Sequence, residues 1–215
     1  MIITLLMDNP KSWFYPFAEN LKEKLGGLGH EVELVHTTDD IKDGELAFFL
    51  SCEKIIKQPI RDKNKHNLVV HSSPLPAGKG WSPMTWTILA GENVITNTLF
   101  EAVDAVDAGV IYIQNSITFE GGELLPELHA AQGQAIVDII IEFLSAYPEV
   151  IERGEEQVSE ESFYERRRPE DSKLDLNKTI ADQFNLLRVV DNEKYPAFFN
   201  YKGSKYILKI YKDNN

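Results

Sequence analysis

The chain has 215 residues, of which 43% are hydrophobic and 26% charged, a composition typical of one globular α/β domain with a small extension. Its net charge of −12 argues against non-specific nucleic-acid binding, although a local basic patch could hold a small phosphorylated ligand. The single cysteine, Cys52, excludes a disulfide framework and a thiolate zinc site. No stretch approaches the ~20 apolar residues of a membrane helix, and the N-terminus lacks a signal-peptide pattern, so we expect a cytoplasmic protein.

The first half of the chain alternates between strand-like and helix-like patterns. Apolar runs typical of buried strands occupy residues 2–7, 31–36, 46–50 and 68–71. Between the first two, a four-residue spacing predicts an amphipathic helix through Trp13, Phe17, Leu21 and Leu25. This alternation predicts an open, mostly parallel, Rossmann-like α/β sheet with helices on both faces, whose ligands bind at the C-terminal ends of the strands.

The pattern changes after residue 93. Two strand-like runs, 94–103 and 109–117, flank a turn at 104–109, and a long helix is predicted at about 123–146. The acidic segment 150–162 has little apolar pattern, and we interpret it as a linker.

The C-terminal part predicts a helix at about 176–190 and a closing β-hairpin turned at Lys202-Gly203-Ser204. The apolar spacing places Asn185 and Arg188 off the buried side of this helix. That buried side is predicted to comprise Ile180, Phe184, Leu187 and Val190. We therefore divide the chain into residues 1–150, a catalytic domain, and residues 151–215, a linker with a small C-terminal subdomain.

Two side chains are well placed for proton transfer. His71 ends a predicted buried strand, at the edge where α/β proteins bind ligands, and a loop rich in proline and glycine follows it. Asp107 lies in the turn between two strands, from which a side chain can reach into a cleft. A histidine and a carboxylate in one cleft can transfer protons. The alternative is that His71 is a hydrogen-bonded strand-end histidine and Asp107 a turn-forming residue before Gly109.

The order of these residues resembles a known signature. The run HSSPLPAGKGWSPMTW, which begins at His71, and the run TNTLFEAVDAVDAGVIYIQ, which contains Asp107, are similar to the motifs of formyltetrahydrofolate-dependent formyltransferases. The resemblance implies that His71 and Asp107 are catalytic, and that Lys79-Gly80 and Pro83 belong to the family's Arg-Gly-x-x-Pro loop. It covers essentially the whole chain, since RRRPEDS and LLRVVDNEKYPAFF most resemble bacterial nucleotide-sugar formyltransferases of pseudaminic-acid-type pathways.

One position departs from the family pattern. The family has an asparagine two residues before the histidine, and this chain has Val69 there. Such an amide stabilises the oxyanion of the tetrahedral intermediate, an effect worth roughly 3 kcal/mol that valine cannot supply. Either another donor replaces it, with Ser72, Ser73 and Asn97 as candidates, or the protein is a weak catalyst.

The resemblance also implies a folate site. In the family, backbone groups near the third strand and the catalytic aspartate hold the pterin, and these correspond to residues 49–52 and 103–107. For Phe48 and Phe49 taken singly, core packing is the alternative. The residues assigned to 10-formyltetrahydrofolate on this basis are Phe49, Leu50, Ser51, Val103 and Asp104.

Candidates for binding the acceptor lie in the loop after His71 and in the C-terminal part. The basic run 166–168 could pair with a diphosphate, or it could be a solvated run paired with nearby carboxylates. Trp81 could form the floor of a sugar or pterin pocket. The residues assigned to the acceptor are Ser73, Lys79, Gly80, Trp81, Arg167, Asn185, Arg188 and Tyr195.

Together these features predict transfer of a formyl group from 10-formyltetrahydrofolate to the amine of a nucleotide-linked amino deoxysugar, for surface-glycan synthesis. The expected partners are these two small molecules, with no nucleic acid, membrane or metal, and a homodimer is one option. An aminoacyl-tRNA, a ribonucleotide or a peptide is an alternative acceptor, and the tRNA is disfavoured because the chain ends without a basic C-terminal domain. The absence of the asparagine at Val69 also leaves open a catalytically weak binding protein.

Overall fold

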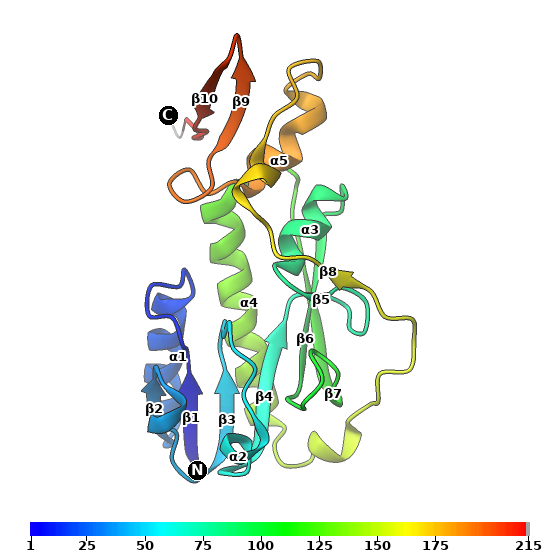
Figure 1. The fold of residues 1–215 in the computed structure, drawn as a ribbon. Coiled ribbons are helices and arrows are strands. Elements are labelled where there is room, and N and C mark those ends of the chain that lie inside the picture. Colours follow the sequence, from blue (N-terminus) through cyan, green and yellow to red (C-terminus); the bar gives the residue numbers. More distant parts are fainter. Residues whose placement is uncertain (214–215) are drawn as a thin grey trace.

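The computed structural model describes residues 1–213, and a six-stranded sheet forms its centre (Figure 1). The strands lie in the order β2-β1-β3-β4-β6-β7. Their bounds are Ile2–Leu6 for β1, Glu31–Val35 for β2, Gly44–Phe49 for β3, Asn64–His71 for β4, Val94–Glu101 for β6 and Ile111–Thr118 for β7. Strands β1 to β4 pair in parallel, and β6 and β7 are antiparallel additions. The predicted mostly parallel α/β sheet is confirmed.

Helices and loops cover both faces of this sheet. The α-helices are α1 Tyr15–Gly27, α2 Gln58–Arg61, α3 Pro83–Leu89, α4 Leu125–Ser145 and α5 Phe184–Val189. The short 3₁₀ helices are η1 Thr38–Asp40, η2 Ile151–Arg153, η3 Pro169–Ser172 and η4 Ala181–Gln183. Within residues 1–213, none of the helices is long and apolar enough to cross a bilayer.

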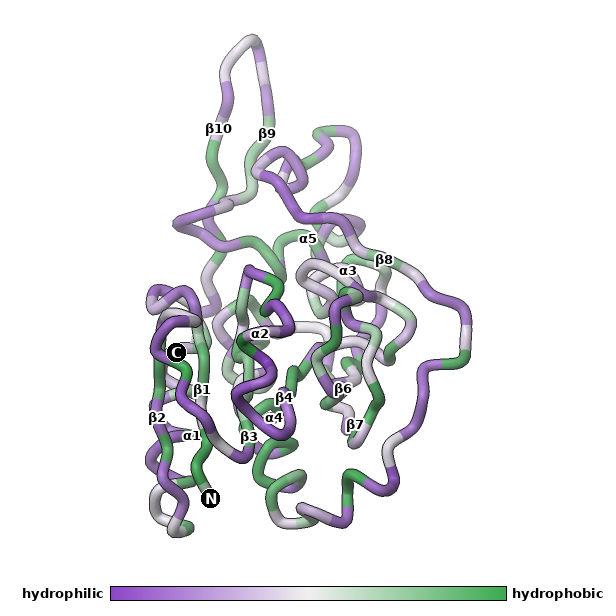
Figure 2. Tube along the Cα trace, turned by 60° about the horizontal axis from the view of Figure 1, so that its bottom comes forward, coloured by the Kyte–Doolittle hydropathy of each residue, from purple (hydrophilic) through white to green (hydrophobic). Residues whose placement is uncertain are grey.

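Side-chain alternation along the strands divides the core into two layers. On one face, residues such as Leu5 and Phe48 pack against α1 and α4 and form the main core. On the other face, Leu6 and Phe49 pack with Ile56 and Ile60, from the loop that contains α2. The strands are accordingly hydrophobic along much of their length, whereas many of the connecting loops are hydrophilic (Figure 2). The second face is only thinly covered, which leaves room for a site.

The C-terminal part carries a hairpin that projects from the body of the molecule (Figure 1). Its strands are β9 Ala197–Tyr201 and β10 Ser204–Leu208. Lys202 and Gly203 form the connection with φ angles of 48° and 81°, the left-handed values that a two-residue hairpin turn requires. The predicted hairpin is therefore confirmed.

The helix expected at 176–190 is much shorter in the structure. Only η4 and α5 are helical there, and Ile180, predicted to be buried, is 58% exposed. Side chains compete with the backbone before this point, since a carboxylate of Asp182 accepts from the N–H of Thr179 and that of Asp175 from the N–H of Asn177. Such local bonds favour turns over helix.

The acidic segment interpreted as a linker is bound to the domain along its length. We call residues 155–166 the strap; it follows the outside of the molecule and ends beyond strand β8, Phe163–Tyr164 (Figure 1). Its backbone pairs with Ile111 at one end and with β5, Lys79–Gly80, at the other. Hydrophobic periodicity could not reveal this, because the strap binds through its backbone, polar side chains and the ring of Tyr164, which stacks on Trp86. The division of the chain at residue 150 stays a prediction.

The partly buried His129 makes the stability of the fold sensitive to acid. The ring of His129, on α4, stacks on Trp13 with 4.1 Å between centroids, and burial lowers its pKa from 6.5 to about 4. Between about pH 6.5 and 4, His129 is therefore protonated in the unfolded chain but neutral in the folded one. The free energy of unfolding accordingly falls as the pH drops through this range. We expect His129→Phe to retain about 2 kcal/mol that the wild type loses between pH 7 and 5. Urea unfolding at both pH values measures this difference, and parallel losses in the two proteins would refute it.

Candidate active site

A cleft of about 360 Å³ opens over the thinly covered face of the sheet, in the size range of small-molecule sites. Its floor consists of Phe49, Val69 and Phe100, which are register partners on β3, β4 and β6. One wall is the loop 51–56 after β3, and the other is the loop 102–107 after β6.

His71 and Asp107 meet in this cleft, as the sequence predicted. The Nδ1 atom of His71 lies 3.8 Å from Oδ2 of Asp107, and their side chains are 10% and 15% exposed. Nε2 of His71 lies 2.8 Å from the carbonyl oxygen of Gly78, which can only accept, so this nitrogen carries a proton. The tautomer of neutral His71 is thus set by Gly78 and not by Asp107. Nδ1 is left free to accept a proton beside the carboxylate.

The backbone around Asp107 explains why an Asp-x-Gly sequence occurs here. Asp107 has a φ of 49°, a left-handed conformation that aspartate tolerates better than most residues, and its Oδ2 accepts from the N–H of Gly80 at 2.9 Å. At Gly109, a Cβ atom would lie 1.7 Å from the carbonyl oxygen of Glu101. Any side chain at 109 would therefore push the turn off the sheet and carry the Asp107 carboxylate away from His71.

The residues assigned to folate are only partly in the cleft. Phe49, Ser51 and Val103 line it. Leu50 is 3% exposed and belongs to the core on the α4 side, and Asp104 forms an ion pair of 2.7 Å with Arg61. The structure therefore does not support side-chain roles for Leu50 and Asp104 in binding.

Of the residues assigned to the acceptor from the loop after His71, Gly80 and Trp81 line the cleft. Ser73 and Lys79 are each 1% exposed and do not reach it. Lys79 Nζ lies 2.6 Å from Oε1 of Glu161 in the strap, and the two side chains form an ion pair. The expectation that Ser73 and Lys79 contact the acceptor is wrong for this structure, because the loop turns both inward.

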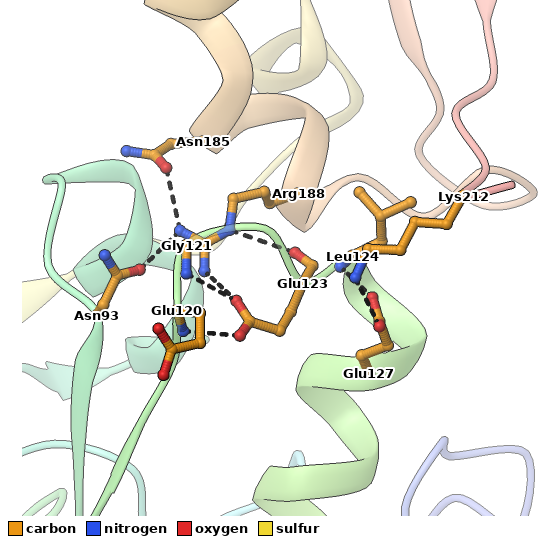
Figure 3. Close-up of polar contacts among 9 residues, drawn as sticks. All are labelled: Asn93, Glu120, Gly121, Glu123, Leu124, Glu127, Asn185, Arg188 and Lys212. Atoms are coloured by element: carbon orange, nitrogen blue, oxygen red, sulfur yellow. Dashed lines mark hydrogen bonds and ion pairs between the residues drawn. The ribbon is translucent and has the colours of Figure 1, made fainter. Parts of the chain in front are cut away.

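Arg188, predicted to be accessible for a diphosphate, is 1% exposed, and Figure 3 shows its guanidinium among the side chains of Glu123, Asn93 and Asn185. Its guanidinium donates to the carboxylate of Glu123 at 3.1 Å, to the backbone carbonyl of Glu123 at 3.2 Å, and to the side-chain oxygens of Asn93 and Asn185 at 2.8 and 3.1 Å. It thereby joins α5 to the start of α4. The expected accessibility of Arg188 is therefore wrong, because the short helix turns the arginine inward, which apolar spacing did not reveal. The nucleotide role assigned to Asn185 stays a prediction.

The basic run 166–168, which begins at the end of the strap, places Arg166 beside the cleft. The arginine assigned to the acceptor was Arg167. Arg166 stacks on Trp81, with its guanidinium carbon 4.4 Å from the ring centroid, and pairs with Glu53 at 3.1 Å, so it spans two residues that line the cleft. Arg167 instead donates to the backbone oxygen of Asp171, and Tyr195 lies in the C-terminal subdomain away from the cleft lining. A basic run alone could not show which of its members faces the cleft.

None of the three donors proposed to replace the missing asparagine lines the cleft: Ser72 and Asn97 are bound elsewhere, and Ser73 Oγ is buried without a hydrogen-bond partner among the described residues. Ser72 donates to Asn97 at 2.8 Å and accepts from Gln132 of α4 at 2.6 Å, and Asn97 donates to Asn115 at 3.1 Å. This buried chain of polar groups lies between the sheet and α4, away from the cleft lining. None of the three side chains is therefore placed to stabilise an oxyanion in the cleft.

Val69 itself fits an apolar floor. Its cross-strand neighbours are Phe49 and Phe100, so an amide at position 69 would lie between two aromatic side chains. We expect Val69→Asn not to raise kcat/KM, because a partly buried amide between two aromatic side chains would leave polar groups unpaired, at a cost of about 1–3 kcal/mol. Steady-state kinetics of the variant tests this, and a gain of a hundredfold or more would instead mark the wild type as an impaired catalyst.

Comparison with known proteins agrees with this geometry. The model of a family described as formyl transferase matches residues 29–139, just over half of the chain, including β4, His71 and Asp107. The chain belongs to the formyl transferase family. It is thus a folate-dependent formyltransferase, an enzyme that uses formyl-tetrahydrofolate.

Solved structures share the fold of this formyltransferase. Methionyl-tRNA formyltransferase from Clostridium thermocellum is 21% identical with a TM-score of 0.76, over 97% of this chain and 91% of the other. A sugar N-formyltransferase from Shewanella sp FDAARGOS_354 is 16% identical with a TM-score of 0.72, over 99% and 98%. HypX from Aquifex aeolicus in complex with tetrahydrofolic acid is 20% identical with a TM-score of 0.73, over 97% of this chain and 37% of HypX.

The cleft suits the chemistry of this family. Its volume and its apolar floor fit a flat pterin, and the His71–Asp107 pair lies beside that floor. Burial raises the pKa of the Cys52 thiol, which also lines the cleft, to about 12, so this sulfur stays protonated and is a poor nucleophile. The arrangement therefore favours direct transfer assisted by proton movement over a cysteine-bound intermediate.

Proposed function

We propose that this formyltransferase moves the formyl group of 10-formyltetrahydrofolate to the amine of a nucleotide-linked amino sugar. The observation that carries the chemistry is the pairing of His71 Nδ1 and Asp107 Oδ2 at 3.8 Å on the rim of an apolar cleft. The folate's pterin occupies that cleft and its formyl carbon lies near His71. The amino sugar enters from the side of Trp81 and Arg166.

His71 and Asp107 have separate roles in the proposed reaction. The neutral amine attacks the formyl carbon, and the carbon's bond to the folate nitrogen breaks. The amine must lose one proton, and the folate nitrogen must gain one. Nδ1 of His71 is free to receive the first and return the second, because Nε2 is committed to Gly78. Asp107 stabilises the imidazolium formed between these steps, since its carboxylate faces the nitrogen that takes up the proton.

Charge and surface chemistry favour a small nucleotide-linked acceptor. The net charge of −12 opposes a long phosphate backbone but not one diphosphate held by a local cation. Arg166 is such a cation at the cleft, and Trp81 beside it offers an aromatic surface to a sugar or base. A sugar N-formyltransferase shares this fold and so is compatible with a sugar acceptor. A methionyl-tRNA formyltransferase also shares it and is equally compatible with the alternative acceptor, an aminoacyl-tRNA.

A panel of acceptors tests this proposal. The purified protein is incubated with 10-formyltetrahydrofolate and, in turn, uridine- and thymidine-diphosphate amino sugars, methionyl-tRNA and glycinamide ribonucleotide, and the release of tetrahydrofolate is followed. We expect release only with an amino-sugar nucleotide, together with a product that carries one added formyl group. Release with methionyl-tRNA alone would replace the proposed acceptor, and no release with any amine would favour a binding protein.

A further inference from the structure

The turn that carries Asp107 has little packing of its own. It joins β6 to β7, and Val103 and Val106 within it are 39% and 45% exposed. Asp107 also adopts a left-handed φ, which costs free energy in a residue other than glycine. A turn of this kind needs an external support if its carboxylate is to stay at a fixed distance from His71.

The strap supplies a support at the backbone of Asp107. The Nε2 atom of Gln157 donates to the carbonyl oxygens of Asp107 and Gly109, at 3.1 and 2.8 Å. The amide NH₂ group has two hydrogens: one donates to the carbonyl oxygen of Asp107 and the other to that of Gly109. The reversed amide would set its oxygen against two carbonyl oxygens, so the orientation of Gln157 is determined.

The same strap also binds the loop that holds His71. Ser162 Oγ accepts from the N–H of Gly78 at 2.8 Å, and the carbonyl of Gly78 is the group that accepts from Nε2 of His71. Ser162 O accepts from the N–H of Lys79 at 2.9 Å. One continuous segment therefore fixes the partner of the histidine at one point and the turn of the aspartate at another.

We propose that Gln157 is a positioning residue for the formyl transfer, which holds the turn of Asp107 so that its carboxylate faces Nδ1 of His71. This inference rests on the proposed roles of His71 and Asp107. Gln157 does not line the cleft, so it acts through the backbone of Asp107 and not on the substrates. The apparent linker is in this way part of the catalytic apparatus.

The test compares Gln157→Met, which keeps the length of the side chain but has no donor, with Val158→Ala, a control at the neighbouring residue, which is 91% exposed. We expect Gln157→Met to lower kcat at least tenfold, because a displacement of about 1 Å in a reacting group costs up to about a hundredfold. The KM for 10-formyltetrahydrofolate should change less than about threefold, and the melting temperature by less than about 3 °C. Val158→Ala should match the wild type in all three.

Two further measurements separate the possible outcomes. In an Asp107→Asn background, Gln157→Met should have little further effect on kcat, since the group that it positions is already lost. A crystal structure of Gln157→Met should show the Asp107 carboxylate displaced from the N–H of Gly80. A wild-type kcat in Gln157→Met, or a loss of kcat explained by a large fall in melting temperature, overturns the inference while the proposed function stands. Full activity in Asp107→Asn alone would overturn both.

Discussion

Replacement of His71 by alanine is expected to lower kcat by about a thousandfold or more. Nδ1 of His71 is the proton acceptor that the cleft presents beside the Asp107 carboxylate, and general base catalysis is worth about 10²–10⁴ in rate. Binding of folate should change little, because the floor and both walls of the cleft remain. Single-turnover measurement of tetrahydrofolate release with a confirmed acceptor gives the rate directly.

His71→Asn is the matched control for this experiment. The asparagine keeps a neutral hydrogen-bond donor at the end of β4 but cannot take up a proton, so we expect it to retain more activity than alanine and still fall far below the wild type. His36, a histidine outside the cleft lining, provides a second control as His36→Ala. Near-wild-type turnover in His71→Ala would rule out the mechanism.

Arg188→Ala is expected to destabilise the fold and to leave substrate binding intact in whatever protein remains folded. The substitution would leave Glu123 and Asn93 without their buried partner, and removal of one member of a buried ion pair costs about 3–5 kcal/mol. For a chain of this length, that corresponds to a fall of about 10 °C in melting temperature. Thermal unfolding followed by circular dichroism measures it.

Arg167→Ala is the comparison for Arg188→Ala. Arg167 is another arginine of the C-terminal part. Within residues 1–213 its guanidinium donates to the backbone oxygen of Asp171 and to no side chain, so its removal should cost much less stability. A small change in melting temperature for Arg188→Ala, together with a raised KM for the sugar nucleotide, would contradict the structural role and restore the binding role.

The alternation of apolar strands and amphipathic helices was sufficient to predict the sheet, because each element buries an apolar face that leaves a period in the sequence. The same reasoning failed at 176–190, where Asp175 and Asp182 bond to nearby backbone groups and stop the helix. It also failed for the strap, whose contacts are made by backbone, polar side chains and the ring of Tyr164. Polar attachments of this kind have no period, so they become visible only in three dimensions.

Within the site, His71 and Asp107 were candidates because each ends or turns a strand at the edge where such sites form, and the resemblance to the formyltransferase motifs assigned them catalytic roles. Arg188 was misplaced because the apolar spacing put it off the buried side of its helix, whereas Glu123 compensates its charge inside the protein. Gln157 was missed because a lone glutamine in an acidic segment carries no signal. Its partner atoms are backbone oxygens, which every residue has, so side-chain chemistry in the sequence could not identify them.

The most direct test of the central claim is the single-turnover rate of formyl transfer to an amino-sugar nucleotide in the wild type and in Asp107→Asn. Asparagine keeps the size of aspartate but removes the charge that faces Nδ1 of His71 at 3.8 Å. We expect tetrahydrofolate and the formylated sugar nucleotide to form together in the wild type, and at least about a hundredfold more slowly in Asp107→Asn. Equal rates in the two proteins would contradict the account.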